Sequence, residues 1–161
     1  MKKTILAGIA LSAIAATAAA TPVMALDVTK SAMVSAPPET VWKTIGAFCG
    51  IGDWHPAVEK CELSDKGGKK HRTLSLKGGG TILEEQVARD DKKMDYTYTI
   101  LESPLPVADY KSTIAVAKDG SGSKVTWNGT FKAKGADDAK AQEVIGGIYE
   151  AGLKGISEKA K

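Results

Sequence analysis

Residues 72–86 read RTLSLKGGGTILEEQ, and this stretch decides the fold. Polar and apolar side chains alternate before and after its three central glycines, which is the period of a β-strand with one face on a core. The glycines themselves predict a hairpin turn. We therefore expect an antiparallel hairpin in which Leu74 lies opposite Glu84 and Leu76 lies opposite Ile82.

The same alternation extends over most of the chain, from residue 59 to residue 134. A turn at residues 90–92 would bring Tyr98 opposite Glu84. The last two strands carry further inward sets: Tyr110, Ser112, Ile114, Val116, Val125, Trp127, Gly129 and Phe131. This pattern predicts an antiparallel meander whose even-numbered side chains, from Arg72 through Val116, face the terminal helix.

Helical patterns flank these strands. A β-prone stretch at residues 27–34 is followed by a helix that starts at Pro38, where a missing N–H costs nothing. A second short helix or turn follows at Trp54, and a long helix begins at Asp137. Four glycines inside that helix indicate either close packing on the sheet or a gap beneath it: Gly146, Gly147, Gly152 and Gly155. The order strand, two helices, six strands, helix is that of an α+β fold.

The chain begins with the pattern of a secretory signal peptide. Two lysines precede an uncharged apolar run, and small residues stand before a predicted cut after Ala25. We expect residues 1–25 to be removed, leaving residues 26–161 as one periplasmic or secreted domain without stable membrane insertion. Without those two lysines the domain has 20 basic and 19 acidic residues, and no basic stripe that would favour nucleic acid.

Two cysteines remain in the exported part, Cys49 and Cys61. In an oxidising compartment an isolated pair predicts a disulfide, which would stabilise the domain by roughly 3 kcal/mol through a loop of about 13 residues. A redox or metal site is the alternative. The spacing is not that of a redox motif, and only two histidines could complete a metal shell, so no metal or cofactor is expected.

Several short motifs, in this order and spacing, resemble one protein superfamily. They are Ser35 to Trp42, Phe48 to Gly50, Trp54 to Pro56, Arg72 to Leu74, Glu84, Tyr98 to Ile100, Leu105 to Pro106 and Val125 to Trp127. Across residues 27–159 the chain resembles the START/Bet v 1-like (SRPBCC) superfamily, in its polyketide cyclase/dehydrase and lipid-transport branch. It is most similar to MxaD-like proteins, which are associated with periplasmic methanol oxidation.

This resemblance implies a helix-grip fold, in which a curved sheet wraps around the terminal helix and leaves a cavity between them. Family members hold apolar or amphipathic molecules there, and a minority catalyse cyclisation or dehydration. The resemblance predicts the fold and its cavity, but it does not predict which ligand the cavity holds.

Eight residues are the candidates for ligand binding: Trp54, His55, Arg72, Leu74, Glu84, Tyr98, Tyr110 and Trp127. Arg72 shares a face with leucines, so it needs a buried partner, and Glu84 is the expected one. The ion pair either orients a bound ligand or has a structural role alone, in which each charge is balanced by the other and the pair holds the curvature of the sheet. His55 is either an acid–base group or a corner residue bound to the backbone. His71 falls on the outward face, where we expect it to be solvated.

Three functions follow from this sequence. The first and preferred one is a carrier or sensor of an apolar small molecule. The second is an accessory protein that docks on a periplasmic dehydrogenase or cytochrome. The third is an enzyme of the cyclase, dehydratase or isomerase type that would use His55, Arg72 or Glu84, with His55 as a weak candidate for catalysis.

Overall fold

The computed structural model describes residues 24–161, so residues 1–23 of the predicted signal peptide lie outside the described part. The elements are β1 (Leu26–Val34), α1 (Pro38–Ile45), α2 (Ile51–Trp54), β2 (Val58–Lys66), β3 (Lys69–Leu76), β4 (Thr81–Asp90), β5 (Asp95–Glu102), β6 (Val107–Asp119), β7 (Gly122–Ala133) and α3 (Asp138–Lys159). This order confirms the predicted one. No helix within this part is long and apolar enough to cross a membrane.

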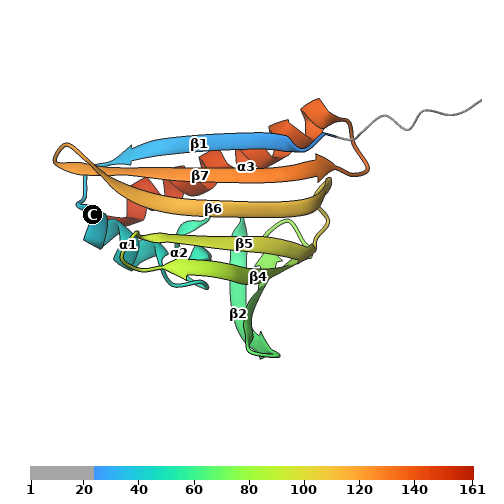
Figure 1. Ribbon diagram of the computed structural model, residues 1–161, viewed down its shortest axis with the longest axis horizontal. Coiled ribbons are helices and arrows are strands. Elements are labelled where there is room, and N and C mark those ends of the chain that lie inside the picture. The colour runs from blue at the N-terminus through green and yellow to red at the C-terminus, as the bar shows by residue number, and fades with distance from the viewer. Residues whose placement is uncertain (1–23) are drawn as a thin grey trace, which may run out of the picture.

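All strands join one antiparallel sheet in the order β1-β7-β6-β5-β4-β3-β2. The sheet curves so strongly that β2 runs across the direction of β1 (Figure 1). The helix α3 lies along one face and packs mainly against β1 and β7, while α1 and α2 lie beside one end of the sheet. The predicted helix-grip, Bet v 1-like fold is confirmed.

Local sequence signals place the helix ends. α1 has Pro38 in its first turn and buries Val41 and Ile45 on one face. Asp137 caps the start of α3, and its carboxylate accepts a hydrogen bond from the backbone N–H of Lys140 at 2.7 Å. That bond satisfies one of the free N–H groups at the helix start.

The predicted pairing of β3 with β4 is wrong by two residues. Leu74 lies opposite Ile82, and Arg72 lies opposite Glu84. The turn has three residues but lies one residue earlier than predicted, at residues 77–79, because the backbone N–H of Leu76 donates to the carbonyl of Gly80 and that of Gly79 donates to the carbonyl of Leu76. The shift by two keeps every side chain on its predicted face, and it turns a diagonal contact between Arg72 and Glu84 into a direct cross-strand pair.

The pairing of β4 with β5 also differs from the prediction. Tyr98 lies opposite Gln86 and not opposite Glu84, whose partner is Ile100. The register shifts between Gln86 and Ala88, as in a β-bulge, so that Arg89 lies opposite the buried Tyr96. The even-numbered residues therefore face the core along β3 and the first half of β4, but not in the rest of β4; in β5 the even-numbered Tyr96 and Tyr98 are buried as predicted.

The inner face predicted for β6 and β7 is confirmed. Its residues are buried from one end to the other: Tyr110, Ser112, Ile114, Val116, Val125, Trp127, Gly129 and Phe131. These side chains meet those of α3 and α1 in one continuous core. Two of these residues, Tyr110 and Trp127, also line the candidate site.

The contacts around the glycines of α3 distinguish between close packing on the sheet and a gap beneath the helix. A Cβ atom on Gly152 would stand 2.5 Å from Cζ3 of Trp127 and 2.7 Å from Cδ2 of His55, and one on Gly155 would overlap the carbonyl oxygen of Trp54. Both glycines therefore serve close packing. Gly147 has open space around it, so no contact requires a glycine there.

Candidate functional site

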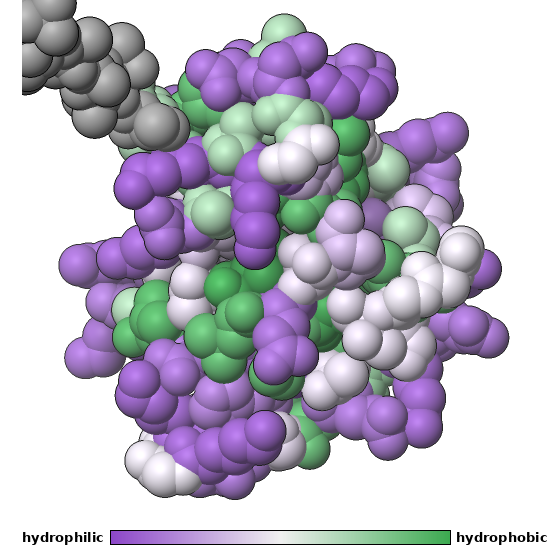
Figure 2. All heavy atoms as spheres, turned by 90° about the vertical axis from the view of Figure 1, so that its right-hand side faces the viewer, coloured by the Kyte–Doolittle hydropathy of each residue, from purple (hydrophilic) through white to green (hydrophobic). Residues whose placement is uncertain are grey.

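A cavity of about 150 Å³ lies between α3 and the inner face of β3 to β6. Its lining is almost entirely apolar: Ile51, His55, Ala57, Val58, Leu74, Leu76, Ile82, Glu84, Tyr98, Ile100, Leu105, Tyr110, Trp127, Ile145 and Ile148. Leu76, Ile100, Leu105 and Ile148 are only half-buried and so mark its rim. Figure 2 shows apolar residues gathered on this end of the molecule, where β5 passes into β6.

The cavity brings together six of the eight candidate residues: His55, Leu74, Glu84, Tyr98, Tyr110 and Trp127. Trp54 and Arg72 are buried but do not line it. Trp54 packs edge-on against Trp127, and Arg72 stands behind Glu84. These two residues belong to the wall behind the lining, and ligand contact by the other six stays a prediction.

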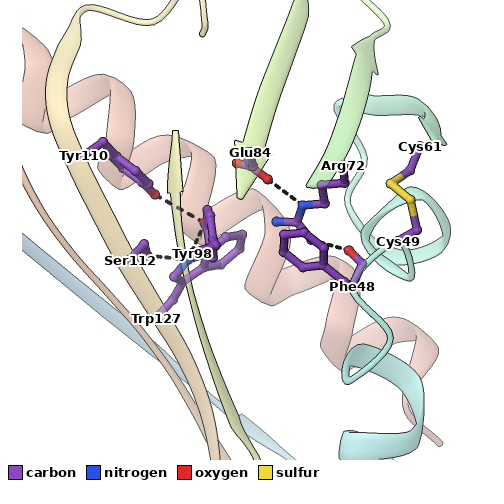
Figure 3. A network of polar contacts seen from close by, with 9 residues as sticks. All are labelled: Phe48, Cys49, Cys61, Arg72, Glu84, Tyr98, Tyr110, Ser112 and Trp127. Carbon is purple, nitrogen blue, oxygen red and sulfur yellow. Dashed lines mark hydrogen bonds and ion pairs between the residues drawn. A yellow bond between two sulfur atoms is a disulfide. The ribbon is translucent and has the colours of Figure 1, made fainter. Parts of the chain in front are cut away.

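Arg72 and Glu84 form a buried ion pair (Figure 3). Nε of Arg72 donates to Oε2 of Glu84 at 2.5 Å, and its Nη1 donates to the backbone carbonyl of Phe48. The two side chains are 0 and 5% exposed. Because strands β3 and β4 place them directly opposite each other, neither side chain has to bend to reach its partner.

Aromatic rings enclose the guanidinium of Arg72. Its Cζ lies 4.1 Å from the ring centre of Phe48 and 4.9 Å from that of Tyr98. Such contacts stabilise a desolvated cation by about 2 kcal/mol or more. Nη2 of Arg72 has no hydrogen-bond partner among the described residues. The cation is thus held by one carboxylate, one carbonyl and these two rings, with the ring centre of Tyr96 further away at 6.0 Å.

Burial and pairing act in opposite directions on the pKa values of Glu84 and Arg72. Burial raises the pKa of Glu84, and the positive charge of Arg72 opposes this shift. Burial acts to lower the pKa of Arg72, but Glu84 and the nearby tyrosines outweigh it and raise that pKa further above its ordinary value. Arg72 therefore stays charged at every accessible pH, and charge neutrality of the buried pair favours an ionised Glu84.

A chain of buried hydroxyl groups forms the second polar feature of the site. Ser112 Oγ donates to the carbonyl of Asn128 at 2.7 Å and lies 2.9 Å from the hydroxyl of Tyr149. The hydroxyl of Tyr110 lies 2.6 Å from that of Tyr149 and 3.3 Å from that of Tyr98. Burial raises the pKa of all three tyrosines, so these groups stay neutral at physiological pH.

Trp127 connects these hydroxyl groups to the cavity wall. Its indole N–H donates to the hydroxyl of Tyr98 at 3.1 Å and to Ser112 Oγ at 3.0 Å, and its ring stacks on Tyr149 at 4.6 Å between centres. A Cβ on Gly129 would overlap the hydroxyl of Tyr149, so a glycine is required at this crossing. Tyr149 is a site residue that the sequence predictions missed, and its helical spacing from Ile145 is the signal that points to the core face.

His55 has both ring nitrogens engaged by the backbone. Nδ1 accepts from the N–H of Ala57 at 3.2 Å, and Nε2 lies 3.1 Å from the carbonyl of Ile148, to which it donates. The neutral ring fits both bonds, whereas a proton on Nδ1 would face the N–H donor. Burial lowers the pKa of His55, and the hydrogen bond to Ile148 opposes that effect. This geometry supports the corner role and leaves no ring nitrogen for acid–base chemistry.

A pH-dependent loss of stability follows from His55. Since its pKa is lowered on folding, its contribution to stability is complete above about pH 6.5 and is lost as the pH falls towards the folded-state value. We expect the unfolding free energy of the native protein to fall below pH 6.5 relative to that of His55→Gln, by at most about 1.4 kcal/mol per pH unit.

Urea unfolding of both proteins at several values between pH 7.5 and pH 5.5 measures this difference. Glu84 acts with the opposite sign, because its pKa is raised, but it is present in both proteins and cancels. Equal pH dependence in the two proteins would contradict the neutral, backbone-bound ring.

The disulfide is present as predicted. Cys49 and Cys61 are bonded, with their Cα atoms 5.5 Å apart. The bond joins the segment before α2 to β2, and Cys49 directly follows Phe48, whose carbonyl accepts from Arg72 (Figure 3). The disulfide thus fixes the corner that supplies one acceptor of the buried cation.

The prediction that His71 is solvated is wrong. This residue is only 4% exposed, because Nδ1 is bound to the carbonyl of Lys69 at 2.9 Å and Nε2 lies 3.3 Å from Glu85. Lys69 also pairs with Glu85 and helps to cover the ring. The alternation of the strand predicted the outward face correctly, but not the side chains that fold over it.

Residues 25–161 match the family described as polyketide cyclase / dehydrase and lipid transport. The chain belongs to this family. The resemblance to the SRPBCC superfamily inferred from short motifs is thereby confirmed. A comparison with curated proteins found no match to this protein.

Solved bacterial structures of the same fold are similar to this family member. The protein XoxI of Bacillus cereus is 37% identical, with a TM-score of 0.79, over 83% of this chain and 94% of its own. A protein of Bacillus thuringiensis is 36% identical, with a TM-score of 0.77, over 83 and 97% of the two chains. The Zhui aromatase/cyclase of Streptomyces sp. R1128 is 20% identical, with a TM-score of 0.70, over 85 and 94%, and shows the fold alone.

Proposed function

We propose that this protein binds a small apolar molecule in the periplasm. The observation that carries the proposal is the cavity between α3 and the sheet, whose walls are apolar and whose tyrosine and histidine polar groups are bound to one another or to the backbone. An engineered cavity of about 150 Å³ with apolar walls binds benzene in another protein, so one ring-sized molecule fits this volume. A lipid would need more space, since typical ligand pockets hold about 300–1,000 Å³.

The periplasmic location rests on the first 25 residues and on the disulfide. The match to the family begins at residue 25, next to the predicted cut, and a bonded cysteine pair is typical of an oxidising compartment. The tyrosine, histidine and arginine contacts leave few groups for chemistry, which favours binding over catalysis.

Native mass spectrometry of the protein taken from the periplasmic fraction tests both parts at once. We expect a chain that begins at Leu26 and carries one small neutral adduct. A chain that retains residues 1–25 would contradict export and cleavage. A mature chain that never carries an adduct, even after incubation with small aromatic compounds, would contradict ligand binding.

Docking on a periplasmic dehydrogenase or cytochrome is the second candidate function. The small volume of the cavity is the observation that favours it, because a domain with little room for a ligand can act through its surface instead. Affinity capture from periplasm with the mature chain as bait tests this alternative, and a partner that binds equally well when the cavity is filled by Leu105→Trp would support it.

A further inference from the structure

The wall of the cavity has few polar groups, and their donors are already used. Ser112 donates to the carbonyl of Asn128, so the hydroxyl of Tyr149, 2.9 Å away, must donate to Ser112. Tyr110 then donates to Tyr149 at 2.6 Å, and Tyr98 donates to Tyr110 at 3.3 Å. Each hydroxyl proton in this chain therefore has one acceptor, and each link follows from the one before it.

The side-chain N–H donors of two further lining residues, Trp127 and His55, are also engaged. The indole N–H of Trp127 is shared between Tyr98 and Ser112, and the ring N–H of His55 is directed at the carbonyl of Ile148. A ligand that brings only acceptors would have to break one of these bonds. Breaking a buried hydrogen bond leaves a group unpaired and weakens binding.

One carboxylate oxygen of a lining residue accepts no hydrogen bond from the described residues. Glu84 lines the cavity, and its Oε2 accepts from Arg72, but no hydrogen bond reaches its Oε1 from any residue between 24 and 161. Arg72 does not line the cavity, so it balances the charge of Glu84 without being able to pair with a ligand. The free polar atom that the wall offers is thus an oxygen of an ionised carboxylate.

We propose that the cavity selects small, neutral ring compounds that carry one hydroxyl or N–H donor, such as a phenol or a cyclic amide, and rejects carboxylates. This inference rests on the proposed function and names the class of ligand. A donor would complete the hydrogen bonding of Glu84, and a bond to a charged acceptor is stronger than one between neutral groups. An anion would stand beside a carboxylate, and a cation would leave an unbalanced charge buried next to a neutral pair.

Matched probes test this selectivity on the native protein, so no variant has to fold for the main comparison. Phenol and toluene have the same size and differ by the donor, and benzamide and benzoate differ mainly by the charge. Binding of each probe is measured by NMR titration at pH 7. We expect phenol to bind about tenfold or more tightly than toluene, in line with the net strength of a hydrogen bond to a charged group. Benzamide should bind at least tenfold more tightly than benzoate.

The variant Leu105→Trp fills the half-buried rim and provides the control for location. It should weaken the binding of phenol at least tenfold, and unchanged binding would contradict occupancy of this cavity. Toluene binding as tightly as phenol, or benzoate as tightly as benzamide, would overturn the donor rule while leaving ligand binding intact. If none of the four probes binds, the proposed function itself fails, and the inference falls with it.

Discussion

Replacement of Arg72 by methionine should lower the free energy of unfolding by about 3–5 kcal/mol. The substitution keeps the length of the side chain but removes the charge that balances Glu84. The carboxylate would then stay buried at 5% exposure with no cation beside it. The stacking on Phe48 and Tyr98 and the bond to the carbonyl of Phe48 would also be lost.

Chemical denaturation followed by circular dichroism measures this effect. The double variant Arg72→Met/Glu84→Leu removes both charges, so it should be clearly more stable than the single variant, and it keeps the test readable if the single variant does not fold. The exposed pair Lys60–Glu62, 3.0 Å apart, is the matched control, and Lys60→Ala should change stability by less than about 1 kcal/mol. A similarly small change for Arg72→Met would show that the buried pair does not hold the sheet.

Alanine at Gly152 or Gly155 should destabilise the protein by about 1–3 kcal/mol, although alanine favours helix. A methyl group at Gly152 would strike the rings of Trp127 and His55, and one at Gly155 would strike the backbone of Trp54. α3 would have to move away from the corner at α2. Backbone cannot yield as a flexible side chain can, so the larger effect is expected at Gly155.

The same substitution at Gly147 is the control. Beyond the adjoining residues and backbone of its own helix, no atom of the described residues lies within 4 Å of the position its Cβ would take, so Gly147→Ala should raise stability by up to about 1 kcal/mol through helix propensity. Thermal unfolding of the three variants side by side gives the comparison. Equal behaviour at the three positions would contradict the close approach of α3 to the corner.

The sequence predicted the faces of the strands better than their pairing. A side chain's face depends only on odd or even position, so Arg72 and Glu84 could be assigned to the core from the alternation alone. Register depends on the turn, and the turn lies at residues 77–79, one residue before the position that the three glycines suggest. The irregularity after Gln86 leaves no mark in the sequence, because one extra residue looks like an ordinary continuation of the strand.

In the candidate site, too, the sequence predicted which side chains face the core better than it predicted how they meet. The cavity brings together residues that alternation and the family resemblance had selected, including Glu84, Tyr98 and Trp127. Tyr149 lies at helical spacing from Ile145, but its hydroxyl reaches Ser112 and Tyr110 only because α3 passes close to Gly129 of β7. A cavity volume depends on how side chains from several elements fit together, and no periodic pattern contains that information.

A crystal pressurised with xenon tests the central claim most directly. An engineered cavity of about this volume with apolar walls takes up xenon. We expect a single xenon peak between α3 and the sheet, among Leu74, Ile82 and Ile145. Xenon found only at the surface, with side chains filling the space beneath α3, would mean that this fold encloses no binding site.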